Sequence, residues 1–490
     1  MTKFWRILAL ILLLSLLAQP AAAQQISDDS TLFLPVVLRD YGSSNQLRAT
    51  NAVYLNVADI PRERFREMSI FWFGRVSESD NYQDVRVAYN NTELVVDVST
   101  FDRRIWFNRN PGSSPFEDWD AVTLLLQTAL FGADAPLPQS YRFVVQFRDL
   151  AQNEPVPSAY RMAYRGNGSG WQVSPLNFQA FTNWRGEGGV NTDRDNRGWR
   201  ITFRIPFSTL GWNQPPHNSQ MRMALISHDR DSQAGPPGTS FTWPEDVNRD
   251  SPATWGNLRF GLPVYAPPRA INLRTLLIRE GENGTSVPDA AVGGTIGNQC
   301  PGDPYHIWNE WGNLNYANES SAIIQNQADI ADWPCFSKYF VTFPLDGIPP
   351  GKVIRSARLV LHHWGGSGSI NDPDPARRPN SSFIHAFSLR DDWQENSITW
   401  NNAPLAQENL SVLRVGVYNI TQEGEGWPGA AHEWDVSAAA ASAYQSGAPL
   451  RLALYSSDSS YHSGKYFSAS ETEAWNSIGR PTLLVEYGDP

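Results

Sequence analysis

The sequence predicts an all-β protein made of two consecutive β-sandwich (jelly-roll-like) domains behind a signal peptide. Many short segments alternate apolar with polar residues, as half-buried strands do. Gly and Pro (36 and 35 of 490 residues) interrupt these segments along the whole chain, and helical periodicity is rare. Alternation with one polar face is typical of antiparallel sheets packed on one side, and two such sheets form a sandwich.

Residues 1–23 have the pattern of a secretory signal peptide. Lys3 and Arg6 give a positive start, an apolar run follows over residues 7–17, and Ala21 to Ala23 offer small residues for cleavage. The run is about half of the ~20 residues that a membrane-spanning helix needs. We therefore expect a secreted or cell-surface protein with no membrane span, in which a polar leader over residues 24–50 follows the signal.

The first β-sandwich is predicted over residues 51–263. Residues 82–89 and 200–207 alternate between apolar and polar side chains, and Asn90-Asn91 predicts a turn into the apolar segment 94–98. Each of these strands should turn its apolar side chains toward the core and its polar side chains toward solvent.

The second β-sandwich is predicted over residues 275–487, after a semi-rigid linker over residues 264–274 that contains Pro267-Pro268. Segments such as 339–343, 450–455 and 482–487 are strand-like. One helix is expected at Ser437–Ala443, with Asp435 as its N-cap and Gly447 as its stop.

Charge and cysteine content exclude several functions. The net charge of −11 argues against a non-specific partner in nucleic acid or an anionic membrane, since both need a basic surface. Two Cys are too few for a disulfide-dense scaffold or a four-Cys zinc site. Because export leads to an oxidising compartment, Cys300 and Cys335 are predicted to form one disulfide.

Motifs of catalysis are mostly missing from the sequence. It contains no P-loop, no His-Glu-x-x-His and no Gly-x-Ser-x-Gly. The stretch from Gly424 to Gly429 fits a dinucleotide-binding spacing, but Pro428 and the lack of a βαβ unit favour a loop. Carboxylates are plentiful, so a glycosidase pair is not excluded by sequence.

Pairs of the form Asp-x-Asp suggest a structural calcium ion, because Ca²⁺ prefers several oxygen ligands close together. Solvated acidic turns are the alternative. The candidate ligands in the first domain are Asp193, Asp195, Asp229 and Asp231.

Tryptophan is abundant, with 19 residues, and several lie in Gly-, Pro- or Asn-rich stretches. An aromatic ring on a loop offers a flat apolar face to the C–H face of a sugar, while nearby polar groups bind the hydroxyls. Core packing is the alternative for each ring. The candidate ligand-binding residues are Trp106, Trp119, Trp171, Trp184, Trp243, Trp308 and Trp311.

A set of segments in the first domain carries a family resemblance: Tyr82–Tyr89, Leu94–Asp102, Trp119–Val122, Gly198–Gly211 and His228–Asp231, followed by Trp243. On these segments the domain resembles the family 9 carbohydrate-binding modules and their cytochrome-like (DOMON-like) relatives. Thr202 stands where family members often have an acid. The resemblance implies a β-sandwich that binds glycan between aromatic faces, often beside Ca²⁺.

A longer set of segments in the second domain carries another family resemblance: Lys338–Leu345, Ile348–Gly351, Ile354–Leu359, Asp392-Trp393, Ser397–Pro404, Trp434–Ser437, Phe467–Glu471 and Arg480–Tyr487. On these segments the domain resembles the DNRLRE domains, which are related to the family 96 carbohydrate-binding modules. An insertion around residues 298–335 departs from the usual pattern and adds Trp308 and Trp311. The resemblance implies a jelly-roll-like sandwich that binds polysaccharide, although such domains also occur in adhesive surface proteins.

Together these features predict a secreted, non-catalytic protein that binds polysaccharide, with no cofactor beyond a structural Ca²⁺. Two alternatives stay open at this point. One is a carbohydrate-active enzyme, a glycoside hydrolase or polysaccharide lyase with an unrecognised acidic site. The other is a structural cell-surface or matrix adhesion protein, whose modules only pack or adhere.

Overall fold

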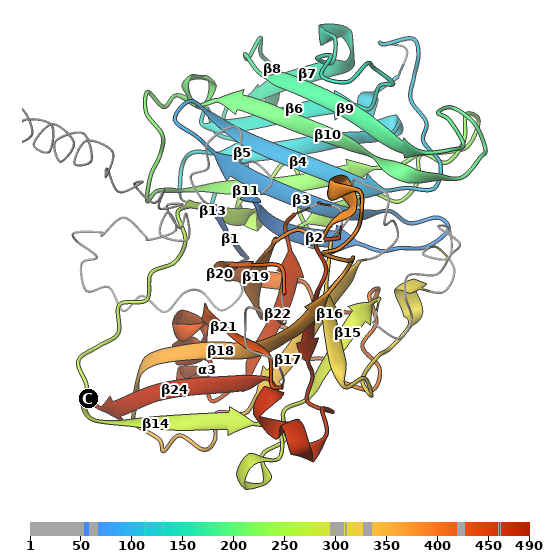
Figure 1. Cartoon of the computed structure of the whole chain (residues 1–490). Coiled ribbons are helices and arrows are strands. Elements are labelled where there is room, and N and C mark those ends of the chain that lie inside the picture. The colour runs from blue at the N-terminus through green and yellow to red at the C-terminus, as the bar shows by residue number, and fades with distance from the viewer. Residues whose placement is uncertain are drawn as a thin grey trace, which may run out of the picture. The chain divides into compact units, whose positions relative to one another are not determined.

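A computed structural model describes residues 53–57, 67–112, 114–130, 132–294, 308, 311–326, 336–418, 427–458, 460 and 462–490. Nearly all regular structure in these residues is β, and the sheets are almost entirely antiparallel, so the predicted all-β fold class is confirmed (Figure 1). The signal segment and both cysteines lie outside the described residues. No helix among the described residues is long and apolar enough to cross a membrane.

The described residues between 53 and 263, here called the first module, pack two sheets face to face (Figure 1). Between them lies a core that includes Val85, Val87, Ile201, Phe203 and Trp199. The first sheet has the order β2 (Ser69–Gly74), β3 (Tyr82–Tyr89), β4 (Glu93–Phe101), β10 (Asn196–Pro206), β9 (Gln179–Gly186). The second has the order β1 (Tyr54–Val57), β13 (Gly256–Phe260), β11 (Gln220–His228), β5 (Ala121–Gln127), β6 (Ser140–Gln146), β7 (Arg161–Gly166), β8 (Trp171–Val173), with β12 (Phe241–Trp243) beside β11.

The second module also packs two sheets around its own core, which includes Leu359, Trp434 and Leu452. One sheet has the order β14 (Ile271–Arg279), β24 (Thr482–Asp489), β18 (Val353–Gly366), β23 (Lys465–Ser468), β16 (Ser321–Ile324), with β21 (Ala430–Asp435) beside β18. The other has the order β15 (Asp289–Gly293), β17 (Ser337–Phe343), β22 (Leu450–Ser456), β19 (Ser382–Leu389), β20 (Ala406–Val415).

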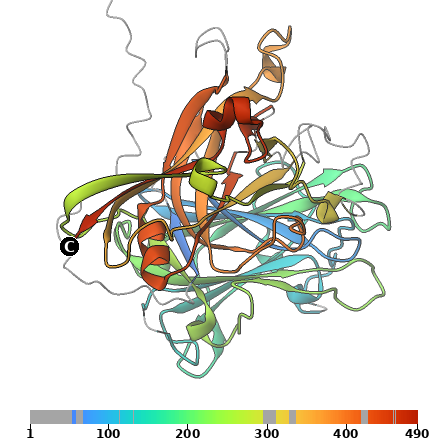
Figure 2. The same ribbon diagram turned by 90° about the horizontal axis from the view of Figure 1, so that it is seen from below.

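The predicted helix is present as α3 (Ser437–Ser446), which is longer than expected at its C-terminus. Val436 is its N-cap, and Asp435 accepts a 2.9 Å hydrogen bond from the backbone N–H of Ser437. Gly447 ends the helix at φ 69°, a left-handed conformation that favours glycine. The helix packs against β18 and β22 (Figure 2).

The two modules are joined by more than their linker. A parallel bridge between Tyr54 of β1 and Glu408 of β20 makes the second sheet of the first module continuous with a sheet of the second. A third hydrophobic cluster, here called the shared core, combines Ile70, Trp72, Val76, Tyr82 and Phe101 of the first module with residues of the second. Those of the second include Phe336, Phe340, Phe387, Trp400 and Tyr455.

Strand β3 shows how this contact alters the sequence-based expectation. Its apolar side chains face the first core as predicted, but its polar side chains are buried too. Arg86 Nε donates a 2.6 Å hydrogen bond to the carbonyl of Ser457, and Asp84 accepts a 2.8 Å bond from the Tyr455 hydroxyl. The polar face of β3 thus contacts the second module instead of solvent.

Candidate functional site

The seven tryptophans predicted from sequence occupy different environments. Trp106, Trp243 and Trp308 are buried, and the Trp243 ring centroid lies 4.3 Å from that of Phe71 in the first core. Such rings pack in the interior and offer no face to a ligand. Trp311 begins the turn Trp311–Asn313, and its side chain lies outside the description.

Trp119 and Trp184 are partly exposed but engaged with their surroundings. The Arg230 guanidinium lies 4.3 Å from the centroid of the Trp119 ring and covers one of its faces. Trp184 packs against the first core, and its Nε1 donates a 2.9 Å hydrogen bond to Asp149.

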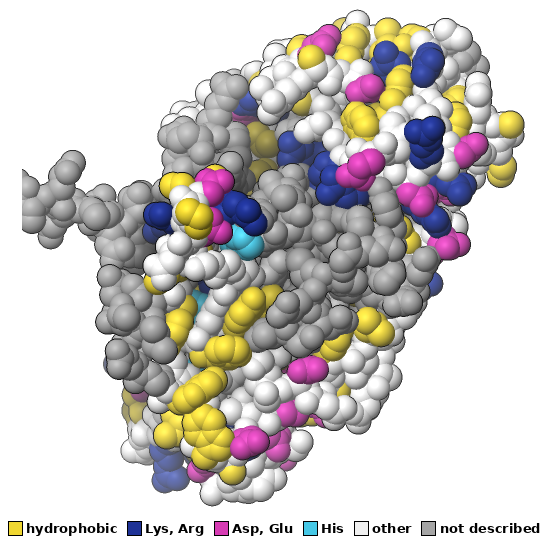
Figure 3. Space-filling model, turned by 45° about the vertical axis from the view of Figure 1, so that its right-hand side comes forward, with side chains coloured by type: hydrophobic (Ala, Val, Ile, Leu, Met, Phe, Trp, Pro, Cys, Tyr) yellow, Lys and Arg dark blue, Asp and Glu magenta, His cyan; other side chains and the backbone are white. Residues whose placement is uncertain are grey.

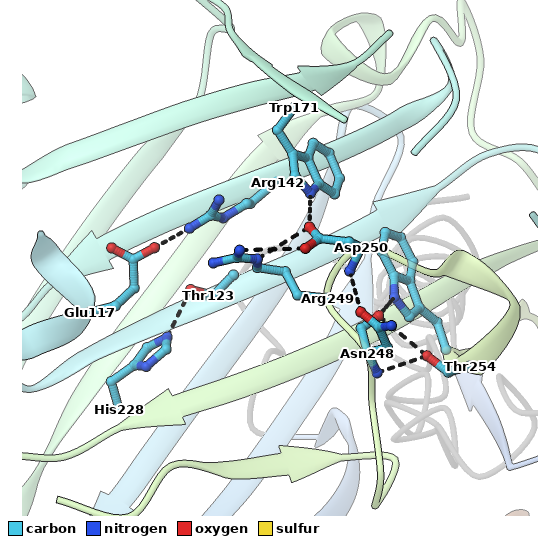
Figure 4. A network of polar contacts seen from close by, with 10 residues as sticks. Glu117, Thr123, Arg142, Trp171, His228, Asn248, Arg249, Asp250 and Thr254 are labelled. Atoms are coloured by element: carbon cyan, nitrogen blue, oxygen red, sulfur yellow. Dashed lines mark hydrogen bonds and ion pairs between the residues drawn. The ribbon is translucent and has the colours of Figure 1, made fainter. Parts of the chain in front are cut away.

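Among the seven predicted tryptophans, Trp171 lies within a network of polar side chains (Figure 4). It opens the short strand β8, and its ring is parallel to that of the buried Trp255 (interplanar angle 3°, centroids 6.3 Å apart). Its Nε1 donates a 2.8 Å hydrogen bond to Asp250, whose carboxylate also pairs with Arg249 at 3.3 Å. A partly exposed ring is therefore held beside an exposed acid and an exposed base.

The loop that carries Asp250 is fixed by its own hydrogen bonds (Figure 4). The carbonyl of Asn248 accepts a 3.1 Å bond from Trp255 Nε1, and Asn248 Oδ1 accepts a 2.9 Å bond from the backbone N–H of Asp250. The Thr254 hydroxyl accepts a 2.9 Å bond from the Asn248 N–H. Asp250 is thereby placed without the ligand having to order the loop, which lowers the entropic cost of binding.

Polar side chains continue from Trp171 across the same face of the sheet (Figure 4). Arg142 of β6 forms an ion pair with Glu117 and lies 4.6 Å from the Tyr164 ring centroid. His228 of β11 shares a 2.9 Å hydrogen bond with the Thr123 hydroxyl, and burial lowers the pKa of His228 to about 4. His228 is therefore neutral at pH 7. This face of the sheet carries acidic, basic and neutral hydrogen-bonding side chains rather than charges of one sign.

An acidic cluster of the first module places three carboxylates together. Asp102, Asp229 and Asp231 each offer an oxygen within 4.8 Å of the others. Asp229 Oδ1 accepts a 2.8 Å bond from Asn81, whereas its buried Oδ2 has no partner. Burial, with the nearby Asp231, raises the pKa of Asp229 to about 8. A buried orphan oxygen among converging carboxylates fits a hard cation such as Ca²⁺.

The cluster contains two of the four acids predicted as calcium ligands. Asp229 and Asp231 are brought together with Asp102, which sequence reasoning did not select. Asp195 instead pairs with Arg103 at 2.6 Å, and Asp193 is exposed. The predicted disulfide of Cys300 and Cys335 falls outside the described residues.

A second group of acids lies in the second module. Asp289, Glu395 and Glu471 offer oxygens within 4.8 Å of one another. The buried Asp289 carboxylate accepts bonds from the Tyr339 hydroxyl and, at 2.7 Å, from the backbone N–H of Ser470. Burial raises the pKa of Asp289 to about 6. These contacts tie β15, β17 and the segment after β23 together.

Sequence reasoning missed Trp427 and Trp475, the most exposed tryptophans among those whose side chains the structure describes. Trp427 follows Gly424-Glu-Gly426 and precedes Pro428-Gly429, the same loop composition that selected other rings. The loop composition of this stretch therefore indicated Trp427 as well, although it is not among the seven predicted residues. Trp475 lies in a polar segment without Gly or Pro beside it and gave no comparable indication.

Comparison with known proteins finds a family model that matches part of the chain. Residues 306–486 match carbohydrate-binding module family 96, which confirms the resemblance stated from sequence for the second module. No curated protein matches the chain.

Two solved structures are similar to part of the chain. They are a family 9 carbohydrate-binding module from Caldicellulosiruptor kristjanssonii in complex with cellotriose and the same kind of module in complex with glucose. Each is 12% identical and covers 44% of this chain and 100% of its own, with TM-scores of 0.32 and 0.30.

Proposed function

We propose that this chain is an exported, non-catalytic polysaccharide-binding protein whose first module binds through Trp171. The observation that carries the proposal is the arrangement of this ring with Asp250 and Arg249. A ring face accepts the C–H face of a sugar, and the paired acid and base accept and donate hydrogen bonds to its hydroxyls. Few polar groups placed around an apolar surface are typical of small-ligand sites.

The charge of the site supports a sugar rather than an ion as its ligand. Arg249 is paired with Asp250 and Arg142 with Glu117, so neither sign of charge dominates this face. A ligand without charge loses little solvation there, whereas a polyanion meets Asp250 and Glu117.

A cation is proposed as a structural brace of the first module. Asp102, Asp229 and Asp231 would hold it, and a bound Ca²⁺ would offset the negative charge of these carboxylates, two of which are buried. Asp102 also accepts a 2.7 Å hydrogen bond from Trp199 Nε1, so the cluster is attached to the first core. Its role is to stabilise the sandwich that carries Trp171.

The proposal is tested by affinity electrophoresis in native gels that contain soluble polysaccharides. We expect retardation of the wild-type protein in at least one gel and weaker retardation of Trp171→Ala. The matched control is Leu130→Ala, another exposed apolar side chain of the first module. Migration of folded wild-type protein without retardation in every gel contradicts the proposal. Release of reducing or unsaturated sugars from the same polysaccharides would instead support the enzyme alternative.

A further inference from the structure

Four aromatic rings of the second module form a continuous run at the surface, here called the aromatic corner: Tyr466, Trp364, Trp427 and Trp475. Successive ring centroids are 5.7, 5.5 and 5.6 Å apart. Trp427 is 53% exposed and Trp475 65%, although tryptophan is usually well buried. A clustered apolar surface of this kind marks a binding site more often than scattered apolar residues do. Figure 3 shows hydrophobic side chains gathered in a run over the lower part of the view.

Three of the four rings come from three separate segments of the chain. Trp364 lies near the end of β18, and Tyr466 lies on β23, which pairs with β18. Trp427 precedes β21, which also pairs with β18. Gly429, at φ 93°, lets this segment approach, because a Cβ there would lie 2.4 Å from the carbonyl oxygen of His363. Two strand neighbours and one close approach therefore bring the rings together.

The fourth ring is held by the turn that follows β23. Trp475 belongs to the 3-10 turn Ala474–Gly479, and its Nε1 donates a 3.1 Å hydrogen bond to Glu473. The end of this turn is anchored by Arg480, which donates to the carbonyls of Thr472 (2.8 Å) and Glu280 (3.0 Å). The exposed ring thus projects from a fixed backbone.

The angles between the rings restrict the shape of a ligand. The planes of Trp364 and Trp427 are inclined by 44°, and those of Trp427 and Trp475 by 87°. Rings at such angles cannot all lie against one flat surface, so the corner does not match the face of a crystalline polysaccharide. It matches a single chain, which can rest one sugar on Trp427 while Trp475 stands beside it.

The charges at the corner restrict the chemistry of that chain. Glu473 is exposed and contacts Trp475, so it repels a polyanion. Arg480 uses its Nε and one terminal nitrogen to donate hydrogen bonds to backbone carbonyls. Among the described residues, none of the four rings has an Arg or Lys over its face.

We infer that the aromatic corner is a second binding site, specific for a single uncharged polysaccharide chain. It is separate from the Trp171 site, since it lies on the other module and shares no residue with it. It rests on the same proposed function of polysaccharide binding, but it assigns a binding surface and a ligand class to the second module. Neutral chains are recognised by ring faces and by hydrogen bonds to Glu473.

The test uses the full chain and the double variant Trp427→Ala/Trp475→Ala. Both side chains are exposed, so the variant should fold, which circular dichroism and the unfolding temperature verify. Probes are native gels with hydroxyethylcellulose, glucomannan or xyloglucan as uncharged chains and alginate as a polyanion, together with sedimentation on microcrystalline cellulose. Trp171→Ala and Leu130→Ala are examined in parallel.

We expect the double variant to weaken binding to at least one uncharged chain about tenfold, as loss of two exposed anchors does. Binding of that uncharged chain by the aromatic corner should persist in Trp171→Ala. The inference is overturned if the double variant binds like wild type while Trp171→Ala does not, an outcome that leaves the proposed function standing. It is also overturned if the double variant loses binding only to alginate or only to crystalline cellulose. Absence of binding by wild type overturns both.

Discussion

Lys338 Nζ donates a 2.7 Å hydrogen bond to the hydroxyl of Tyr82 and thereby joins the two modules inside the shared core. The ammonium also lies 3.6 Å from the ring centroid of Trp400 and 4.3 Å from that of Trp72. The Tyr82 hydroxyl in turn donates to Asp84 at 2.8 Å. A lysine and an aspartate, each fully buried, are thus connected through one tyrosine.

The first prediction concerns this buried lysine. Burial lowers the pKa of Lys338 well below its usual range, and the charge of Asp84 opposes that shift. Lys338→Met should lower the free energy of unfolding by about 2 kcal/mol, because the buried Tyr82 hydroxyl then loses its hydrogen-bond donor. Urea unfolding measures the change.

Lys352→Met is the matched control for that variant. Lys352 pairs with Asp489 at the surface, where such pairs contribute less than about 1 kcal/mol. Equal stability of the Lys338 variant and wild type would contradict a role of Lys338 in joining the modules.

The second prediction concerns acid sensitivity. His385 is completely buried on β19, and burial lowers its pKa from 6.5 to about 3. Between these values the unfolded chain binds a proton at this position and the folded chain does not, so stability falls as the pH drops from about 6.5 to about 3. His385→Asn should reduce the loss of unfolding free energy between about pH 7 and pH 4.5. Parallel pH dependence of variant and wild type would exclude this origin.

The third prediction concerns the proposed cation. Adding Ca²⁺ to chelator-treated protein should raise the unfolding temperature, by a stabilisation of about 2.7 kcal/mol at a hundredfold excess over Kd. Asp229→Asn should abolish the increase, since it removes the orphan ligand atom. Asp193→Asn, at an exposed acid outside the cluster, should keep it. A calcium effect that survives in the Asp229 variant places the cation elsewhere.

The fourth prediction concerns the positioning of Trp171. Asp250→Asn keeps an acceptor for Trp171 Nε1 but removes the charge that pairs with Arg249. Asp250→Ala removes both. We expect the affinity for polysaccharide to fall more in the alanine variant, about tenfold, than in the asparagine variant. Isothermal titration with a soluble oligosaccharide measures both, and an unchanged affinity in the alanine variant would remove Asp250 from the site.

Local sequence patterns predicted the fold well, because they record which side chains face a core. The alternation over residues 82–89 gave the strand β3, and Gly447 gave the end of α3. The same alternation could not reveal that the polar face of β3 meets the second module. A polar residue such as Asp84 contributes the same alternation to the sequence whether its side chain contacts water or Tyr455.

The sites were harder to predict because exposure depends on the whole fold. Trp243 and Trp427 each precede a proline, yet one is buried against Phe71 and the other is exposed. The cluster of Asp102, Asp229 and Asp231 joins residues more than 120 positions apart. Asp229 and Asp231 form the Asp-x-Asp motif that indicated a calcium ligand. Asp102 belongs to no such motif, so the sequence did not indicate it as a ligand.

The shared core has a consequence for valency. Two proposed sites on modules that share buried side chains keep a set separation, so a polysaccharide long enough to span them binds the second site as an intramolecular step. Oligosaccharides shorter than that span gain nothing from the second site. The apparent affinity should therefore rise abruptly at one chain length rather than gradually with each added sugar. The protein would then discriminate polysaccharides by their length as well as by their composition.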